Sequence, residues 1–206
     1  MKDRYEVVVI GGGIVGCAVL YHLALRGKTD TLLLEREELT AGSTWHAAGG
    51  FHAINADTRV AALQLYTISM YPKIQKESGV DVGLKMSGGL ELAGSPERWE
   101  WLQQELAWLR AQGHDDAYIV SAEQAAEMVP IIDPEGIYGA LFDPDEGNLD
   151  PNGATRAYAV ASRDRGADLV EHNRMLGLER LPSGAWRLVR SRRWNVAKVG
   201  PSDQFR

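Results

Sequence analysis

The chain has 206 residues, with 28 acidic and 22 basic side chains and a formal net charge of -6 at pH 7. This acidic balance argues against nucleic-acid binding. Hydrophobic residues make up 45% of the chain and charged residues 24%, which is typical of a globular protein and gives no sign of disorder. A single cysteine, Cys17, excludes an internal disulfide and a cysteine-rich metal site.

The amino terminus enters a strand-like run without a basic leader followed by an apolar stretch, so we expect no signal peptide. No apolar run approaches the roughly 18 residues that are needed to span a bilayer. We therefore expect a soluble protein with no membrane partner, and a cytoplasmic location by default.

A βαβ unit is predicted at the start of the chain. Residues 5–10 (YEVVVI) form a β-branched run typical of a buried parallel strand, and residues 31–35 (TLLLE) form the next one. Residues 14–26 between them show helical spacing, and Gly27 follows as a C-cap. The apolar side chains that carry this spacing are Ile14, Ala18, Tyr21 and Leu25.

The next predicted element is a helix over residues 57–79, capped by Asp57, which we expect Pro72 to kink or divide. Two strand candidates follow, in KMSGGLELAG and in GIYGALFDP. They predict an antiparallel sheet, layered against helices and inserted after the βαβ unit.

Two further helices are predicted from their capping residues. One begins with Ser95 as N-cap and Pro96 in its first turn, and it ends at Gly113. The other opens with a capping box from Ser121 to Gln124.

The remaining elements return to the first sheet. The loop DPDEGNLDP does not match the spacing of a calcium-binding loop, so we interpret it as a connection into a helix over residues 152–166. ADLVEH then predicts a strand that extends the parallel sheet, and MLGLERL and AWRLVR predict a hairpin. The pattern becomes basic and irregular beyond Ser191.

A nucleotide-binding pattern lies in the βαβ unit. Gly11, Gly13 and Gly16 occupy the G-x-G-x-x-G positions directly after a strand and before a helix, where a pyrophosphate can meet backbone amides. Glu35 ends the second strand, where a carboxylate can accept hydrogen bonds from the ribose hydroxyls. The negative charge of the Glu35 carboxylate repels a 2′-phosphate and so favours NAD or FAD over NADP. We count the adjacent Arg36 among the cofactor-binding residues.

The segment ELTAGSTWHAAGG, residues 38–50, places one histidine among small residues. Such a segment can lie flat on a large planar ligand, with hydroxyls offered by Ser43 and Thr44. The chemistry of His46 leaves three interpretations open: a satisfied loop histidine, an acid or base, or a covalent ligand through a ring nitrogen. Metal binding is disfavoured because no second ligand stands nearby. Four other histidines show no partner pattern, and we interpret them as structural or exposed: His22, His52, His114 and His172.

Three stretches together resemble the N-terminal FAD-binding part of the dimethylglycine and sarcosine dehydrogenases, within the D-amino-acid-oxidase-like flavoproteins. They are VVVIGGGIVGCAVLYHLALRG, the T-W-H-A-A-G element with its surroundings from Leu32 to Gly49, and GNLDPNGATRAYAVASRDRGADLVE. The resemblance covers roughly residues 4 to 190.

The resemblance implies that FAD is bound covalently through His46, by the 8α-methyl group of the flavin. It implies that Ser43 and Thr44 contact the cofactor and that the strand near Met175 approaches the adenine. The expected fold is α/β, a Rossmann-like FAD-binding domain with a parallel sheet flanked by helices and part of an antiparallel substrate-side layer. We expect this truncated domain to occupy residues 1–191, followed by an irregular tail over 192–206.

The implied reaction is oxidative N-demethylation of dimethylglycine or sarcosine, with hydride transfer from the N-methyl carbon to the flavin. The full-length family also implies an electron acceptor and folate as partners. The chain stops before a strand of the family's N-A-A-G-x-W type, so we name no substrate-side catalytic residue. Two alternatives stay open: a related amino-acid oxidase with non-covalent FAD, and a truncated nucleotide-binding fragment without catalysis.

Overall fold

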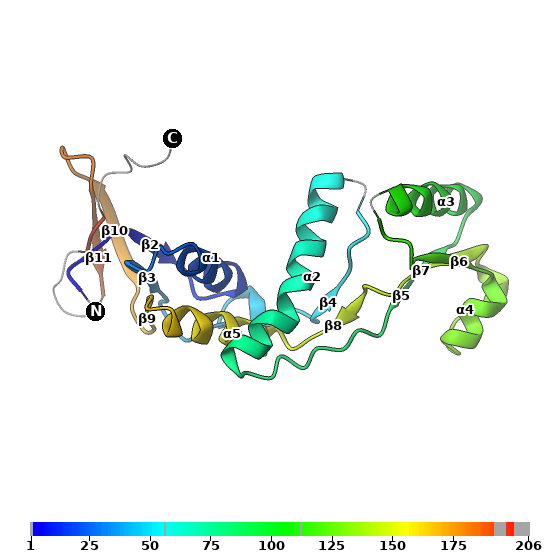
Figure 1. The fold of residues 1–206 in the computed structure, drawn as a ribbon, viewed down its shortest axis with the longest axis horizontal. Helices are drawn as coiled ribbons and strands as arrows, with labels where there is room; N and C mark the ends of the chain where they lie inside the picture. Colours follow the sequence, from blue (N-terminus) through cyan, green and yellow to red (C-terminus); the bar gives the residue numbers. More distant parts are fainter. Residues whose placement is uncertain (1, 56, 112, 192–196, 200–206) are drawn as a thin grey trace. The chain divides into compact units, whose positions relative to one another are not determined.

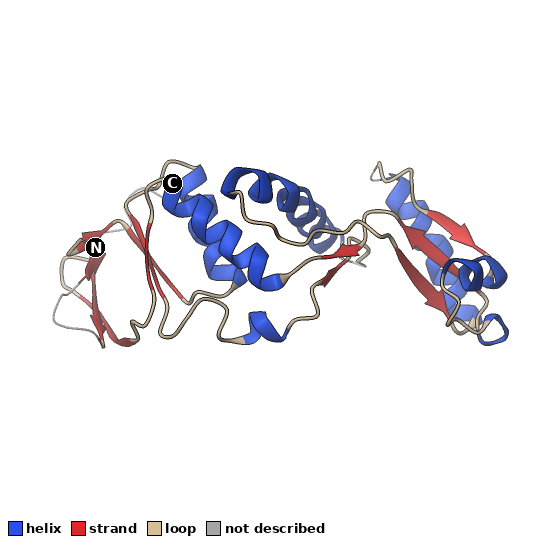
Figure 2. Cartoon of the chain, turned by 90° about the horizontal axis from the view of Figure 1, so that it is seen from below, coloured by secondary structure: helices blue, strands red, loops and turns tan. Residues whose placement is uncertain are grey.

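The computed structural model describes residues 2–55, 57–111, 113–191 and 197–199, and the side chains of all of these except the last three (Figure 1). Backbone contacts divide the chain into two compact units. Unit 1 comprises Met1–Ala48, Pro72–Gly83 and Asp150–Arg206, and unit 2 comprises Gly49–Tyr71 and Leu84–Leu149. Each unit combines helices with strands (Figure 2).

Unit 1 is built on a parallel sheet with the strand order β2-β3-β9. These strands are β2 (Val7–Ile10), β3 (Thr31–Leu34) and β9 (Asp168–Val170). Every residue of the central strand β3 is buried, as the apolar run predicts. Helices α1 (Ile14–Leu25) and α5 (Pro151–Asp164) pack against each other, with Tyr21 of α1 and Tyr158 of α5 5.4 Å apart between ring centroids. The predicted parallel sheet, including its extension by ADLVEH, is therefore confirmed.

The buried face of α1 differs from the predicted one. The helix buries Cys17, Leu20, Tyr21 and Ala24, whereas Leu25 is 43% exposed. Most of this helix is apolar, so the spacing of its apolar residues does not single out one face. The packing partners decide which side is covered.

A second sheet of unit 1 has the strand order β1-β12-β11-β10. Its members are β1 (Arg4–Tyr5), β10 (Met175–Arg180), β11 (Trp186–Arg190) and β12 (Ala197–Val199). Strands β10 and β11 form the predicted hairpin. The strand predicted over residues 5–10 is divided at Glu6, because β1 pairs with β12 in this sheet and β2 pairs with β3 in the other. In the tail predicted to be irregular, 197–199 form β12, and 192–196 and 200–206 lie outside the described residues.

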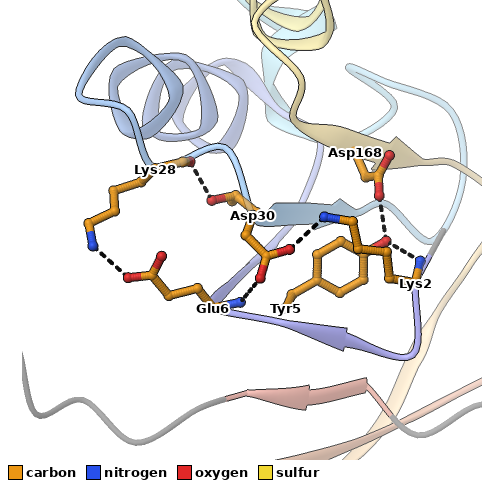
Figure 3. A network of polar contacts seen from close by, with 7 residues as sticks. Lys2, Tyr5, Glu6, Lys28, Asp30 and Asp168 are labelled. Atoms are coloured by element: carbon orange, nitrogen blue, oxygen red, sulfur yellow. Dashed lines mark hydrogen bonds and ion pairs between the residues drawn. The ribbon is translucent and has the colours of Figure 1, made fainter.

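A polar network joins the start of the chain to the parallel sheet (Figure 3). The Tyr5 hydroxyl donates a 2.6 Å hydrogen bond to Asp168 at the start of β9, and burial raises the pKa of Tyr5 to about 12. Ion pairs join Lys2 to Asp30 at 2.8 Å and Lys28 to Glu6 at 2.6 Å. The network fixes β1 beside a sheet with which it does not pair.

Unit 2 contains two antiparallel sheets. Strands β5 (Gly89–Ala93), β7 (Gly139–Asp143) and β6 (Tyr118–Val120) form one sheet in the order β5-β7-β6. Strands β4 (Gly50–Phe51) and β8 (Gly147–Asn148) form the other. The antiparallel sheet predicted from two candidates is confirmed in β5 and β7. Strand β6 was not predicted, because three residues are too few to show a period.

The helices of unit 2 follow their predicted caps. Ser95 accepts a 3.2 Å hydrogen bond from the Arg98 amide at the start of α3 (Pro96–Ala111). Ser121 and Gln124 form the capping box of α4 (Ala122–Met128), and a short 3-10 helix, η2 (Pro134–Gly136), follows. The core of this unit packs α3 against the β5-β7-β6 sheet, and its buried members include Ala93, Leu102, Leu106, Leu109 and Leu141.

Helix α2 (Thr58–Ser78) is a single helix, with Pro72 inside it. Its amino terminus is capped as predicted, because Asp57 accepts a 2.9 Å hydrogen bond from the Arg59 amide. Pro72 therefore does not divide the helix, although the boundary between the two units falls at this residue. In the part of the chain that the structure describes, no helix is both long and apolar enough to cross a membrane.

Candidate functional site

The glycine turn links β2 to α1 and is the first part of the candidate site. Gly11 has a φ of 106°, a left-handed conformation that favours glycine, and its amide donates a 2.9 Å hydrogen bond to the Leu34 carbonyl of β3. A Cβ atom on Gly16 would overlap the carbonyl oxygen of Gly11. The third glycine therefore permits close packing of helix and turn, as the sequence pattern predicts.

Glu35 follows β3 at its carboxyl end and is hydrogen-bonded to the glycine turn. Its carboxylate accepts hydrogen bonds from the Gly12 amide at 2.5 Å and from the Glu37 amide at 2.8 Å, one on each oxygen. Each oxygen has a further lone pair, so the carboxylate can still accept from a ligand. Glu35 thus positions the turn and lines the space beside it.

The segment predicted to contact a cofactor folds onto the glycine turn. Its central part is a 3-10 helix, η1 (Ser43–His46). Thr44 is buried, and its hydroxyl accepts a 3.0 Å hydrogen bond from the Ile14 amide, the first of α1. Gly13, the N-cap residue of α1, has no side chain to do this. Thr44 therefore caps α1 from a distant part of the sequence, and the next amides of the helix remain available to an anion.

His46 ends η1 with an exposed ring. Its Nδ1 atom lies 3.1 Å from the Gly42 carbonyl oxygen, and its ring packs 4.1 Å from the ring of Trp45. A carbonyl oxygen only accepts hydrogen bonds, so Nδ1 carries the proton. In the neutral ring Nε2 then has a free lone pair, which is the state that a nucleophile or ligand requires.

Two cavities of unit 1 bring most of the predicted residues together. The larger cavity, about 460 Å³, is lined at its polar side by Glu35 and by the glycine turn. The smaller cavity, about 260 Å³, shares Gly11, Glu35 and Arg36 with it and extends to Met175. The residues lining the larger cavity are Gly11, Gly13, Ile14, Val15, Glu35, Arg36, Glu37, Ala41, Gly42, Ser43, Thr44 and Ala47.

Two of the predicted residues do not line these cavities. Gly16 packs behind the turn. His46 is absent from the lining residues, although the adjacent Ala47 is among them.

Sequence reasoning missed one buried residue of the smaller cavity. Asn173 is 2% exposed, and its amide oxygen receives no hydrogen bond from any described residue. Asn173 follows the carboxyl end of β9, as Glu35 follows that of β3. Ligands of open α/β sheets bind at the carboxyl ends of the strands. The position of Asn173 just after a predicted parallel strand could therefore have identified it as a site residue.

The residues present fit a dinucleotide such as FAD. The glycine turn and the free amides of α1 suit a pyrophosphate, and the remaining lone pairs of Glu35 suit ribose hydroxyls. The unpaired oxygen of Asn173 offers a polar contact beside Met175. Among the described residues, no group of three or more His, Cys, Asp or Glu side chains is placed to hold a metal ion.

Comparison with known proteins agrees with this fit. Residues 6–199 match the family described as DAO, FAD dependent oxidoreductase. The chain is 36% identical over 186 residues to mitochondrial dimethylglycine dehydrogenase of Rattus norvegicus, an alignment that covers 90% of this chain and 22% of that protein. It is 34% identical over 179 residues to mitochondrial sarcosine dehydrogenase of Homo sapiens, with coverages of 86% and 19%.

A solved structure has the same fold. L-proline dehydrogenase from P. horikoshii superposes with a TM-score of 0.87 at 26% identity, covering 97% of this chain and 52% of that one. The chain therefore spans about a fifth of the length of the two curated relatives and about half of the length of this structure.

Proposed function

Because the chain belongs to the FAD-dependent oxidoreductase family, we propose that it is the FAD-binding part of an enzyme that oxidatively demethylates dimethylglycine or sarcosine. Residues 1–191 would form this FAD-binding part. The observation that carries the proposal is the meeting of the glycine turn, Glu35 and the segment 38–47 around one cavity. The names of the two dehydrogenases it resembles support the choice of substrate.

Different residues of unit 1 bind different parts of the cofactor. Gly11, Gly13 and the first amides of α1 hold the pyrophosphate, and Glu35 accepts from the ribose. The side of the cavity near Met175 takes the adenine. When bound, FAD supplies a two-electron acceptor for oxidation of the carbon next to the amine nitrogen.

We further propose that His46 holds the flavin covalently through Nε2. The ring is exposed, and the hydrogen bond from Nδ1 to Gly42 leaves Nε2 without a proton in the neutral state. The ring also packs against Trp45, with 4.1 Å between the ring centroids. This arrangement favours a covalent ligand over the satisfied loop histidine, because no described residue forms a hydrogen bond with the second ring nitrogen, Nε2.

Acid precipitation tests the covalent attachment. We expect the flavin absorbance of the unmutated protein to stay with the precipitate, and His46→Ala to release it into the supernatant. His46→Ala should still melt at a higher temperature when FAD is added, because the glycine turn and Glu35 remain. His114→Ala is the matched control, since this histidine belongs to unit 2 and pairs with Asp145.

The outcomes of this experiment separate the alternatives. Free flavin in the supernatant of the unmutated protein would contradict the covalent link and favour a non-covalent oxidase, which production of hydrogen peroxide from an amine would then identify. If added FAD changes the melting temperature of neither the unmutated chain nor His46→Ala, and neither protein carries flavin, the cofactor proposal itself is contradicted. That result would favour a fragment that binds no nucleotide.

The partners of the whole protein follow the same resemblance. We propose a small methylated amine as substrate, with an electron acceptor and folate serving the full-length enzyme, and no nucleic-acid or membrane partner. The cytoplasmic location expected from the sequence stays a prediction, and both curated relatives are named as mitochondrial.

A further inference from the structure

Unit 2 has a cavity of its own, of about 490 Å³, which the cofactor proposal does not use. Its apolar lining comes from Phe51, Ile54 and Leu90. Its polar lining comes from Glu91, Glu146 and His52. Polar groups make up the larger part of this lining and apolar side chains the rest, so the cavity suits a small ligand that has both a charged and an apolar part.

Glu146 is the unusual member of this lining. No described residue donates a hydrogen bond to its carboxylate, although the side chain is only partly exposed. A Cβ atom on Gly89 would overlap the Glu146 carboxylate, so the glycine at the start of β5 leaves the space that this group occupies. A carboxylate withdrawn from water without a partner costs free energy, which a bound cation would offset.

The charged groups around Glu146 make the binding of a cation beside it more favourable. Glu91 on β5 pairs with Arg98, whereas Asp143 on β7 is 4% exposed and adds a second negative charge. Burial, and then Asp143, raise the pKa of Glu146 to about 7, while His52 lowers it. At slightly alkaline pH the cavity therefore holds an ionised carboxylate that lacks a counter-ion.

His52 adds a second acceptor. Its Nδ1 atom lies 3.0 Å from the Ile54 carbonyl oxygen, so Nδ1 carries the proton and Nε2 of the neutral ring has a free lone pair. Phe51 contributes an aromatic ring to the lining, and ammonium groups are attracted to aromatic rings. Acceptors, an aromatic ring and aliphatic walls together suit an alkylated ammonium group and disfavour an anion.

We propose that this cavity binds the ammonium group of a methylated amine, with Glu146 as its counter-ion and the apolar walls around its methyl groups. The choice of a methylated amine rests on the proposed function, and the preference for an organic cation rests on the cavity alone. Glu146 would be a binding residue for the substrate that this chain itself contributes.

Calorimetric titration with tetramethylammonium chloride tests the proposal, because this probe keeps its charge at every pH and has no N–H groups. At about pH 8 we expect the unmutated chain to bind the probe and Glu146→Gln to bind it about tenfold more weakly. Gln has the shape of Glu without its charge. Glu100→Gln removes an exposed carboxylate of α3 in the same unit and should change the affinity by less than about twofold.

The pH dependence is a second readout. Glu146 binds a proton as the pH falls through its pKa of about 7, so the affinity of the unmutated chain should fall between about pH 8 and about pH 6. In the Glu146→Gln variant this pH dependence should be lost, because the Gln amide binds no proton in this range. A titration curve that is the same for both proteins would overturn the proposal, as would an absence of binding by the unmutated chain.

Failure of this inference and failure of the proposed function are distinguishable. A chain that binds FAD but not tetramethylammonium contradicts the cavity proposal and leaves the cofactor proposal intact. A chain that binds tetramethylammonium through Glu146 supports the cation site, and it contradicts the flavoprotein proposal if it carries no flavin and its His46→Ala variant is not stabilised by FAD.

Discussion

Gly16 has no room for a side chain, because any Cβ atom there overlaps the Gly11 carbonyl oxygen. Gly16→Ala should therefore push α1 away from the turn, lower the free energy of unfolding by about 2 kcal/mol and weaken FAD binding. Thermal melting with and without FAD, with both proteins also carrying His46→Ala so that the cofactor is not attached, measures both effects. Gly94→Ala is the matched control, since a Cβ atom at Gly94 meets no atom within 4 Å, and unchanged melting of Gly16→Ala would refute the packing argument.

Glu146 makes a separate prediction about stability. Its pKa is raised from 4.5 to about 7 in the folded chain, so the folded state holds a proton that the unfolded state has lost. The contribution of this group to stability is therefore present below about pH 4.5 and is lost as the pH rises to about 7. With solvent screening, the loss is about 2 kcal/mol.

Urea unfolding of the unmutated chain and of Glu146→Gln gives two free energies of unfolding. Their difference at each pH measures the contribution of Glu146. At about pH 8 we expect the variant to be more stable, and at about pH 5 the two proteins should be nearly equal. The comparison cancels Glu105, whose pKa burial also raises, whereas the coupling of Asp143 to Glu146 is part of the measured difference. A variant that is less stable at both pH values would show that the carboxylate has a partner in the folded chain.

The sequence predicted those site residues whose role depends on the local chain. Gly11, Gly13 and Glu35 occupy fixed positions around a strand and a helix, so their spacing alone places them at one turn. Asn173 lies far along the sequence, and only the pairing of β3 with β9 brings it beside Glu35. The part played by Thr44 as a cap for α1 likewise depends on a tertiary contact.

At the scale of the elements, the amino terminus of α5 depends on one capping residue. Asp150 accepts hydrogen bonds from the Asn152 amide at 2.9 Å and from the Gly153 amide at 3.0 Å, one on each oxygen. Asp150→Ala leaves both amides without this acceptor and should lower the free energy of unfolding by about 1 kcal/mol. Asp150→Asn keeps an acceptor and should recover most of that loss in urea unfolding. Equal losses in the two variants would assign the effect to charge alone.

The helices with side-chain caps were predicted closely, because capping is a local interaction. Asp57, Ser95 and Ser121 each begin a helix in the structure as the sequence predicts. The buried face of α1 and the short strand β6 were not predicted, because packing against other elements decides both. Pro72 was expected to kink or divide α2, and the expected division is wrong, because one helix runs from Thr58 to Ser78.

At the scale of the whole molecule, the two proposed ligands belong to different units. All residues that line the two cofactor cavities lie in unit 1, and all residues that line the cation cavity lie in unit 2. In the His46→Ala variant, added FAD should therefore slow hydrogen exchange in the glycine turn, α1 and segment 38–47 more than in β5 and β7. Tetramethylammonium should show the opposite preference. Equal protection of both units by either ligand would contradict this assignment.

The two units are interleaved in the sequence, because the chain leaves unit 1 after Ala48 and returns to it for good at Asp150. Synthesis on the ribosome runs from the amino terminus, so the last residue of unit 2 emerges before α5 and β9 exist. During that interval the edge of β3 that will pair with β9 has no partner. Unit 2 can therefore complete its fold first, while the central strand β3 has one edge exposed to mispairing until β9 has been synthesised.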